Sequence, residues 1–128
     1  GVHAVTDVTG FGLLGHLREM CEGSGVAAVL TRDAVPVFPG ARGLAQEGVR
    51  TGASARVWAS VKDFVAAPDG WPDAERDLLC DPQTSGGLLV SCAPERVNDV
   101  LALFARHGHD AAAVIGRIEA GEPGIALV

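Results

Sequence analysis

Several residue types are scarce in this chain, and each shortage excludes a class of protein. The 128 residues include no tyrosine, two tryptophans and four phenylalanines, and Lys62 is the only lysine. The net charge is −6 and no cluster of basic and aromatic residues occurs, so we expect no nucleic-acid partner. No apolar run approaches about 18 residues, the length that a membrane-spanning helix needs, so we expect no membrane partner.

Cysteine is also sparse. Cys21, Cys80 and Cys92 form an odd set without C-x-x-C spacing, which is typical of small buried side chains rather than of a disulfide framework. None of them has a histidine or basic neighbour in the sequence that would activate a catalytic thiol. No H-E-x-x-H motif or cluster of cysteine and histidine indicates zinc. The sequence therefore predicts a cytoplasmic protein in a reducing environment.

Small aliphatic residues and glycine are abundant. Hydrophobic residues make up 48% of the sequence and glycines number 17, which favours tightly packed layers joined by many turns. At this length the chain suits a single domain over residues 1–128. Helical and strand patterns alternate, which predicts an α/β (α+β) fold with helices packed on a mixed sheet. Helices are expected near 10–22, 73–79 and 94–107, and strands near 2–8, 26–31, 87–92 and 112–118.

Two stretches in the middle of the chain have weaker patterns. A helix is expected over about 39–47, because a proline at its start suits the first helical turn, and Leu44 is expected to face inward. In the next stretch, the alternation of Val57, Ala59 and Val61 indicates a short strand.

The most informative segment is V-H-A-V-T-D-V-T-G-F-G-L-L-G-H, residues 2–16. A strand pattern that carries one carboxylate, Asp7, breaks at Gly10 and Gly12 into a helical pattern. Closely spaced glycines let backbone N–H groups turn toward an anion, and a helix N-terminus favours negative charge. A carboxylate there would repel phosphate unless a divalent cation lay between them. The segment indicates half of a magnesium–nucleotide site; alternatively, Asp7 and Thr9 only end the strand and cap the helix.

A second polar segment, D-P-Q-T-S-G-G, covers Asp81–Gly87 between a helical and a strand pattern. It can form a rigid turn in which Pro82 fixes the backbone, or a loop that faces a ligand. Ser85 lacks the G-x-S-x-G context of a hydrolytic nucleophile. Because strand-end loops converge at ligand sites in α/β proteins, we expect this segment on the same side of the domain as Thr6–Gly12. His16 is interpreted as a packed or surface side chain.

Together the two glycine-flanked segments resemble one family. T-D-V-T-G-F-G-L-L-G-H-L over Thr6–Leu17 and L-L-C-D-P-Q-T-S-G-G-L-L over Leu78–Leu89 are similar to the C-terminal domain of selenophosphate synthetase, also called selenide, water dikinase. This family belongs to the aminoimidazole ribonucleotide synthetase-like superfamily. The later I-G-R-I over Ile115–Ile118 also fits its last strands, and the resemblance covers essentially the whole chain.

The resemblance implies a fragment of a longer enzyme that uses ATP and Mg²⁺ to convert selenide to selenophosphate, with AMP and phosphate as co-products. Asp7 matches the aspartate that completes Mg²⁺ binding, and Thr6, Thr9, Gly10 and Gly12 would contact the nucleotide. An absent N-terminal half of the same chain would form the family's homodimer, hold most of the ATP and supply the catalytic cysteine or selenocysteine and the lysine. No catalytic residue is expected in this chain, which alone would be inactive.

Two alternatives stay open on the sequence. The chain could be the equivalent domain of a sister enzyme, such as aminoimidazole ribonucleotide synthetase, a thiamine-phosphate kinase or a hydrogenase-maturation relative. It could also be a non-catalytic α/β assembly module that keeps the scaffold. Thr51–Val57 matches a family phosphate loop only in part, because Val57 stands where asparagine is expected, so no role is assigned to Arg56.

Overall fold

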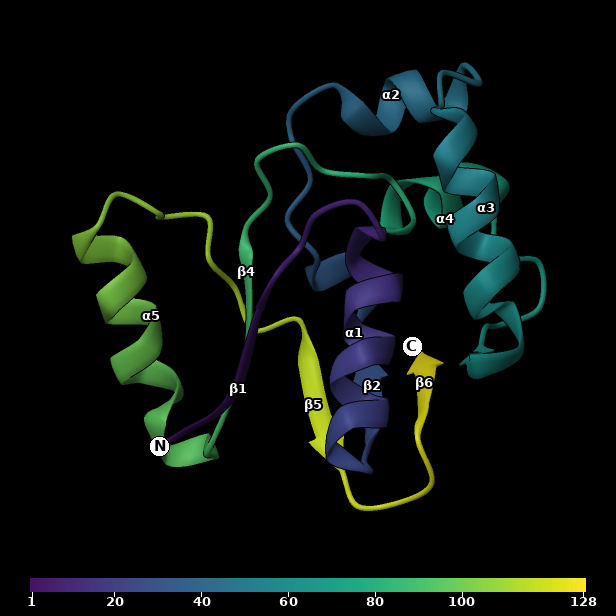
Figure 1. Ribbon diagram of the computed structural model, residues 1–128. Coiled ribbons are helices and arrows are strands. Elements are labelled where there is room, and N and C mark those ends of the chain that lie inside the picture. The colour runs from purple at the N-terminus through teal and green to yellow at the C-terminus, as the bar shows by residue number, and fades with distance from the viewer.

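The computed structural model describes all residues from 1 to 128, and its helices and strands alternate along much of the chain (Figure 1). Three 3₁₀ turns, at 32–34, 62–64 and 94–96, join or extend these elements. The strands are β1 (Val2–Asp7), β2 (Ala27–Leu30), β3 (Val65–Ala66), β4 (Leu88–Cys92), β5 (Gly116–Glu119) and β6 (Gly124–Leu127). The helices are α1 (Gly12–Ser24), α2 (Ala41–Gln46), α3 (Gly52–Val61), α4 (Asp73–Leu79) and α5 (Val97–Arg106).

The strands form two sheets rather than the one that the sequence suggested. β1 and β4 pair antiparallel as a two-stranded ribbon, with Asp7 opposite Leu88. The larger sheet has the order β3-β6-β2-β5, in which β2 runs parallel to β6 and antiparallel to β5. This larger sheet is mixed and carries packed helices, so the predicted α/β class is confirmed.

Helix α1 provides the centre of the core. Leu14, Leu17 and Cys21 recur at intervals of three and four residues and form one buried cluster with Leu30 of β2 and Ile125 of β6. In Figure 1 the helix lies in front of β2, between the β1–β4 ribbon and α3. The helix predicted at about 10–22 is therefore confirmed, with both ends two residues further along the chain. This packing fixes the turn that leads from β1 into α1.

The strand predicted at Val57–Val61 was wrong, because these residues belong to α3. Thr51 caps this helix, and its side-chain oxygen accepts the N–H of Ser54 at 3.3 Å. Val57 and Val61 are buried on one helical face. A separation of four residues fits both a strand face and a helix face, so the apolar spacing alone could not distinguish them.

Two further details differ from the sequence expectation. Leu44 is 52% exposed, not inward, because α2 packs beside α4 through an ion pair in which Arg42 Nε lies 2.7 Å from Glu75 Oε1. The strand expected at 112–118 is β5, which begins only at Gly116. There the backbone approaches the carbonyl group of Val29 so closely that a Cβ would overlap it.

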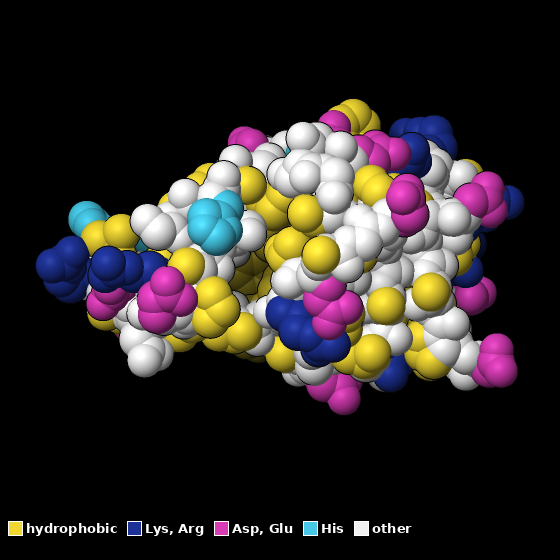
Figure 2. All heavy atoms as spheres, turned by 90° about the horizontal axis from the view of Figure 1, so that it is seen from below, with side chains coloured by type: hydrophobic (Ala, Val, Ile, Leu, Met, Phe, Trp, Pro, Cys, Tyr) yellow, Lys and Arg dark blue, Asp and Glu magenta, His cyan; other side chains and the backbone are white.

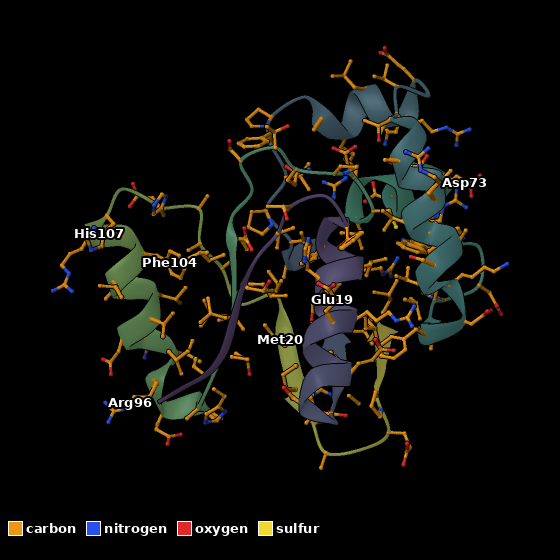
Figure 3. All side chains as sticks on the ribbon, in the orientation of Figure 1. Glu19, Met20, Asp73, Arg96, Phe104 and His107 are labelled. Carbon is orange, nitrogen blue, oxygen red and sulfur yellow. The ribbon has the colours of Figure 1, made fainter.

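Helix α5 lies beside the β1–β4 ribbon, on the side away from α1 (Figure 1). Its apolar residues are half-buried or exposed and none is fully buried, although Phe104 points toward the ribbon (Figure 3). Figure 2 shows a hollow lined by hydrophobic side chains between the α5 side of the molecule and the rest. No helix has the length and apolar character needed to span a membrane.

Candidate functional site

Asp7 is the last residue of β1, and its exposed carboxylate has no hydrogen-bond or ion-pair partner in the chain. The strand register places it on the same face as Val5 and opposite Leu88. An unpaired carboxylate can bind a cation without breaking an existing contact. No group of three or more His, Cys, Asp or Glu residues could hold a metal ion in this structure. Asp7 therefore suits a contributing ligand rather than a complete metal site.

The turn Thr9–Gly12, which joins β1 to α1, has unused backbone donors. The carbonyl oxygen of Thr9 accepts the N–H of Gly12 at 3.1 Å and that of Gln83 at 3.0 Å. The N–H groups of Thr9 and Gly10 have no acceptor in the chain, and no side chain caps α1. Free amides in the turn that leads into an uncapped 13-residue helix form a favourable environment for an anion.

Gly12 has a packing role of its own. Its φ is +61°, and a Cβ built on it would lie 2.7 Å from the carbonyl carbon of Cys80. Its N–H is engaged by the Thr9 carbonyl oxygen. A glycine is thus required here whether or not a nucleotide binds, and the nucleotide contact of Gly12 stays a prediction.

The segment Asp81–Gly87 contacts the end of β1 and this turn directly, so the prediction that it lies on the same side of the domain as Thr6–Gly12 is confirmed. The N–H of Val8 donates to the carbonyl oxygen of Gly87 at 2.9 Å, and the N–H of Gln83 donates to that of Thr9 at 3.0 Å. The two motifs, about 75 residues apart in the sequence, therefore form one junction at the end of the β1–β4 ribbon.

Within this segment, the polar side chains divide into engaged and free groups. Asp81 accepts the Ser54 hydroxyl at 3.4 Å through Oδ1 and the Gln83 amide at 3.2 Å through Oδ2. Ser54 is fully buried, so this contact ties the segment to α3. Thr84 and Ser85 are exposed and have no hydrogen bond in the chain. The segment is thus a rigid turn whose tip is open to solvent.

Two other residues singled out in the sequence lie away from the Asp7 carboxylate. Thr6 is paired with the buried Leu89, so its side chain is on the opposite face of the ribbon from that of Asp7. The Thr6 hydroxyl donates to the Asp7 carbonyl oxygen at 3.3 Å. Arg56 is exposed on α3 and forms no ion pair or hydrogen bond.

Sequence reasoning did not assign a role to His16, which the structure places at the turn. The residue is 7% exposed, and its ring centroid is 5.5 Å from that of Phe11. His16 Nε2 lies 3.4 Å from the Phe11 amide nitrogen and 3.2 Å from Thr9 Oγ1. On the other side of the ring, Nδ1 lies 3.0 Å from Glu19 Oε2. Only its spacing, one helical turn after the glycines, gave any signal for these contacts.

No other feature of the chain forms a competing active site. Burial raises the pKa of the Cys80 thiol to about 12 and also raises that of Cys21, with a further contribution from Glu22. Both thiols are therefore protonated and poorly nucleophilic near neutral pH. A shallow surface hollow of about 330 Å³ is lined by residues 63–66 and 124–126 at the β3–β6 edge, away from the turn.

A family model described as "AIR synthase related protein, C-terminal domain" matches residues 1–128. The chain belongs to this family. Proteins that are called selenide, water dikinase are similar over nearly the whole of this chain. The selenide, water dikinase of Dechloromonas aromatica (strain RCB) is 56% identical over 128 residues, which cover 100% of this chain and 37% of that protein. That of Pseudomonas straminea is 53% identical over 96% of this chain and 34% of its own length. The selenide, water dikinase of Rhizobium meliloti (strain 1021) is 46% identical over 99% of this chain and 36% of its own length.

Solved structures support the same AIR synthase-related fold. Thiamine-monophosphate kinase from Stenotrophomonas maltophilia K279a aligns with a TM-score of 0.64 and 22% identity, over 98% of this chain and 31% of that chain. The hydrogenase maturation protein HypE aligns with a TM-score of 0.61 and 19% identity, over 98% of this chain and 33% of that chain. At these identities the likeness concerns the fold alone. The chain spans about a third of the length of each of these proteins.

Proposed function

We propose that the chain is the C-terminal domain of a selenide, water dikinase. The whole enzyme would use ATP, Mg²⁺ and water to convert selenide to selenophosphate, with AMP and phosphate as co-products. The observation that carries this proposal is 46–56% identity to proteins of that name over nearly the whole chain. The two structural neighbours with other activities share only 19–22% identity, which favours the dikinase over these sister enzymes.

In this proposal Asp7 supplies one carboxylate to the magnesium ion of bound ATP. Mg²⁺ is bound by one or two carboxylates together with phosphate oxygens and waters, and the exposed, unpaired Asp7 fits one such ligand. Magnesium would neutralise the negative charge of the phosphate oxygens during phosphoryl transfer. The chain's own task is to hold this carboxylate rigidly, which the pairing of Asp7 with Leu88 provides.

The turn after Asp7 would bind the phosphate side of the nucleotide. The free N–H groups of Thr9 and Gly10 and the uncapped start of α1 favour negative charge close to the carboxylate. The side chain of Thr6 lies on the other face of the ribbon, so any contribution of Thr6 would come through its backbone or through support of Asp7.

The remaining ligands would come from an N-terminal part of the same protein. The side chains of Val2, Val5 and Leu88 share the ribbon face of Asp7 and are 51%, 54% and 56% exposed. Such an apolar face beside a polar site is suited to burial against another part of the molecule. We therefore expect the isolated chain to be inactive, and the complete enzyme to act as a cytoplasmic homodimer.

The test is Asp7→Asn in the full-length enzyme that carries this chain. Asparagine keeps the shape of the side chain but removes its charge, so selenide-dependent AMP formation should fall at least about 100-fold, more than the loss typical for residues behind a metal ligand. The control is Asp110→Asn, because Asp110 is also exposed and unpaired. Turnover by Asp7→Asn close to that of Asp110→Asn would refute the metal assignment.

A second measurement addresses the substrate. Selenophosphate is detected directly by ³¹P NMR when the full-length enzyme is given selenide, ATP and Mg²⁺. A parallel reaction supplies thiamine monophosphate, ATP and Mg²⁺; formation of thiamine diphosphate there, with no selenophosphate in the first reaction, would assign the chain to a sister enzyme.

A further inference from the structure

The contacts of His16 define which ring nitrogen carries its proton. The backbone N–H of Phe11 can only donate, and it points at Nε2 from 3.4 Å. Nε2 must then be an acceptor without a proton, so the ring proton lies on Nδ1. There the carboxylate of Glu19, 3.0 Å away, accepts it. Glu19 lies on the surface of α1 (Figure 3), so the ring links a solvent-facing carboxylate to the interior of the turn.

We propose that His16 is a positioning residue for the nucleotide-binding turn, with Glu19 selecting its tautomer. By accepting the Phe11 N–H and contacting the Thr9 hydroxyl, His16 fixes both sides of Gly10. The N–H groups of Thr9 and Gly10 are thereby kept out of the internal hydrogen-bond network and available to a phosphate oxygen. This inference rests on the proposed function of the turn.

The contact pattern favours positioning over simple packing. Any ring or aliphatic side chain of similar size could stack on Phe11 and fill the buried site. Only an acceptor at the Nε2 position satisfies the Phe11 amide and leaves the turn with a single geometry. The free amides of Thr9 and Gly10 lie two residues and one residue before Phe11, so a shift of the Phe11 amide moves them directly.

The experiment uses the full-length enzyme with His16→Leu and His16→Gln. Leucine fills the space without an acceptor, whereas the side-chain carbonyl of glutamine can reach the Phe11 amide. His107→Leu, at the exposed residue that follows α5, is the matched control (Figure 3). The measurements are kcat and KM for Mg-ATP, the midpoint of thermal unfolding, and the protonation of each ring nitrogen by ¹H–¹⁵N NMR.

We expect His16→Leu to lower kcat/KM for Mg-ATP about tenfold, the effect of losing about one hydrogen bond, and mainly through KM. His16→Gln should stay within about threefold of the wild type, and His107→Leu should be unchanged. NMR should find the proton of His16 on Nδ1, and Glu19→Ala should weaken that preference.

Equal kcat/KM values for His16→Leu and His16→Gln in an active enzyme would overturn the positioning role of His16 but not the proposed function. A proton on Nε2 would have the same consequence. A wild-type enzyme that makes no selenophosphate would instead contradict the proposed function, whatever the tautomer of His16.

Discussion

Gly86 lies against the backbone carbonyl group of Val8: a Cβ built on Gly86 would be 2.8 Å from the Val8 carbonyl carbon and would overlap its oxygen. Its neighbour Gly87 has nothing within 4 Å of the same position. The two glycines of D-P-Q-T-S-G-G therefore have different functions. The first allows the segment to approach the end of β1, and the second contributes its carbonyl oxygen to Val8.

Gly86→Ala should destabilise the domain by about 2–4 kcal/mol, because backbone atoms cannot move aside as a flexible side chain can. Gly87→Ala, the adjacent control, should change the free energy of unfolding by less than about 1 kcal/mol. Urea unfolding followed by circular dichroism measures both. Equal losses for the two variants would contradict the close approach of Gly86 to Val8.

Thr51→Ala should cost about 1 kcal/mol of stability, because α3 loses the side chain that accepts the Ser54 N–H. The control Thr51→Ser keeps a hydroxyl at the cap and should restore most of the loss. The same unfolding experiment compares the three proteins. If serine and alanine behaved alike, the Thr51 hydroxyl would not stabilise α3.

The sequence was most informative where neighbouring residues determine the local structure. β1, the turn at Gly10 and α1 follow from strand alternation, a glycine break and helical spacing, so both the elements and Asp7 could be located. The placement of Asp81–Gly87 on the same side of the domain as this turn could also be anticipated, because both lie at strand ends.

Other features depend on contacts between distant residues. The separation of the strands into two sheets and the start of β5 at Gly116 depend on how closely backbone segments approach, which no local pattern records. The role of His16 depends on a side chain reaching back seven residues to Thr9 across the turn. A histidine on a helix has many possible environments, so its type and spacing could not identify these contacts.

The buried thiols predict how stability changes at alkaline pH. In the folded chain the pKa of Cys80 is raised to about 12 from an ordinary value of 9.0, because burial disfavours the thiolate. Between these values the unfolded state has lost a proton that the folded state keeps, so the free energy of unfolding falls as pH rises. Cys21 is shifted in the same direction and adds to the effect.

Urea unfolding between pH 8 and 10.5 measures this slope. The chain has no tyrosine and one lysine, so few other groups ionise in that range. Cys80→Ala should flatten the slope even though it lowers the stability at pH 8. An unchanged slope would show that Cys80 does not resist ionisation in the folded state.

The exposed face of the β1–β4 ribbon predicts a difference between the isolated chain and the full-length enzyme. Val5 shares the face of Asp7 and is 54% exposed, whereas Val49, between α2 and α3, is 59% exposed and away from the ribbon. If the N-terminal part covers the Asp7 face, Val5 is buried only in the full-length enzyme.

Val5→Asn should then cost about 1–3 kcal/mol more in the full-length enzyme than in the isolated chain, the value of burying a valine side chain. Val49→Asn should have the same effect in both, and comparing each variant in two contexts cancels the lower strand propensity of asparagine. The free energy of unfolding of this domain, followed by hydrogen exchange of the β1 amides, gives both differences. An equal effect of Val5→Asn in the two contexts would mean that the ribbon face stays open and that the N-terminal part does not cover the Asp7 face.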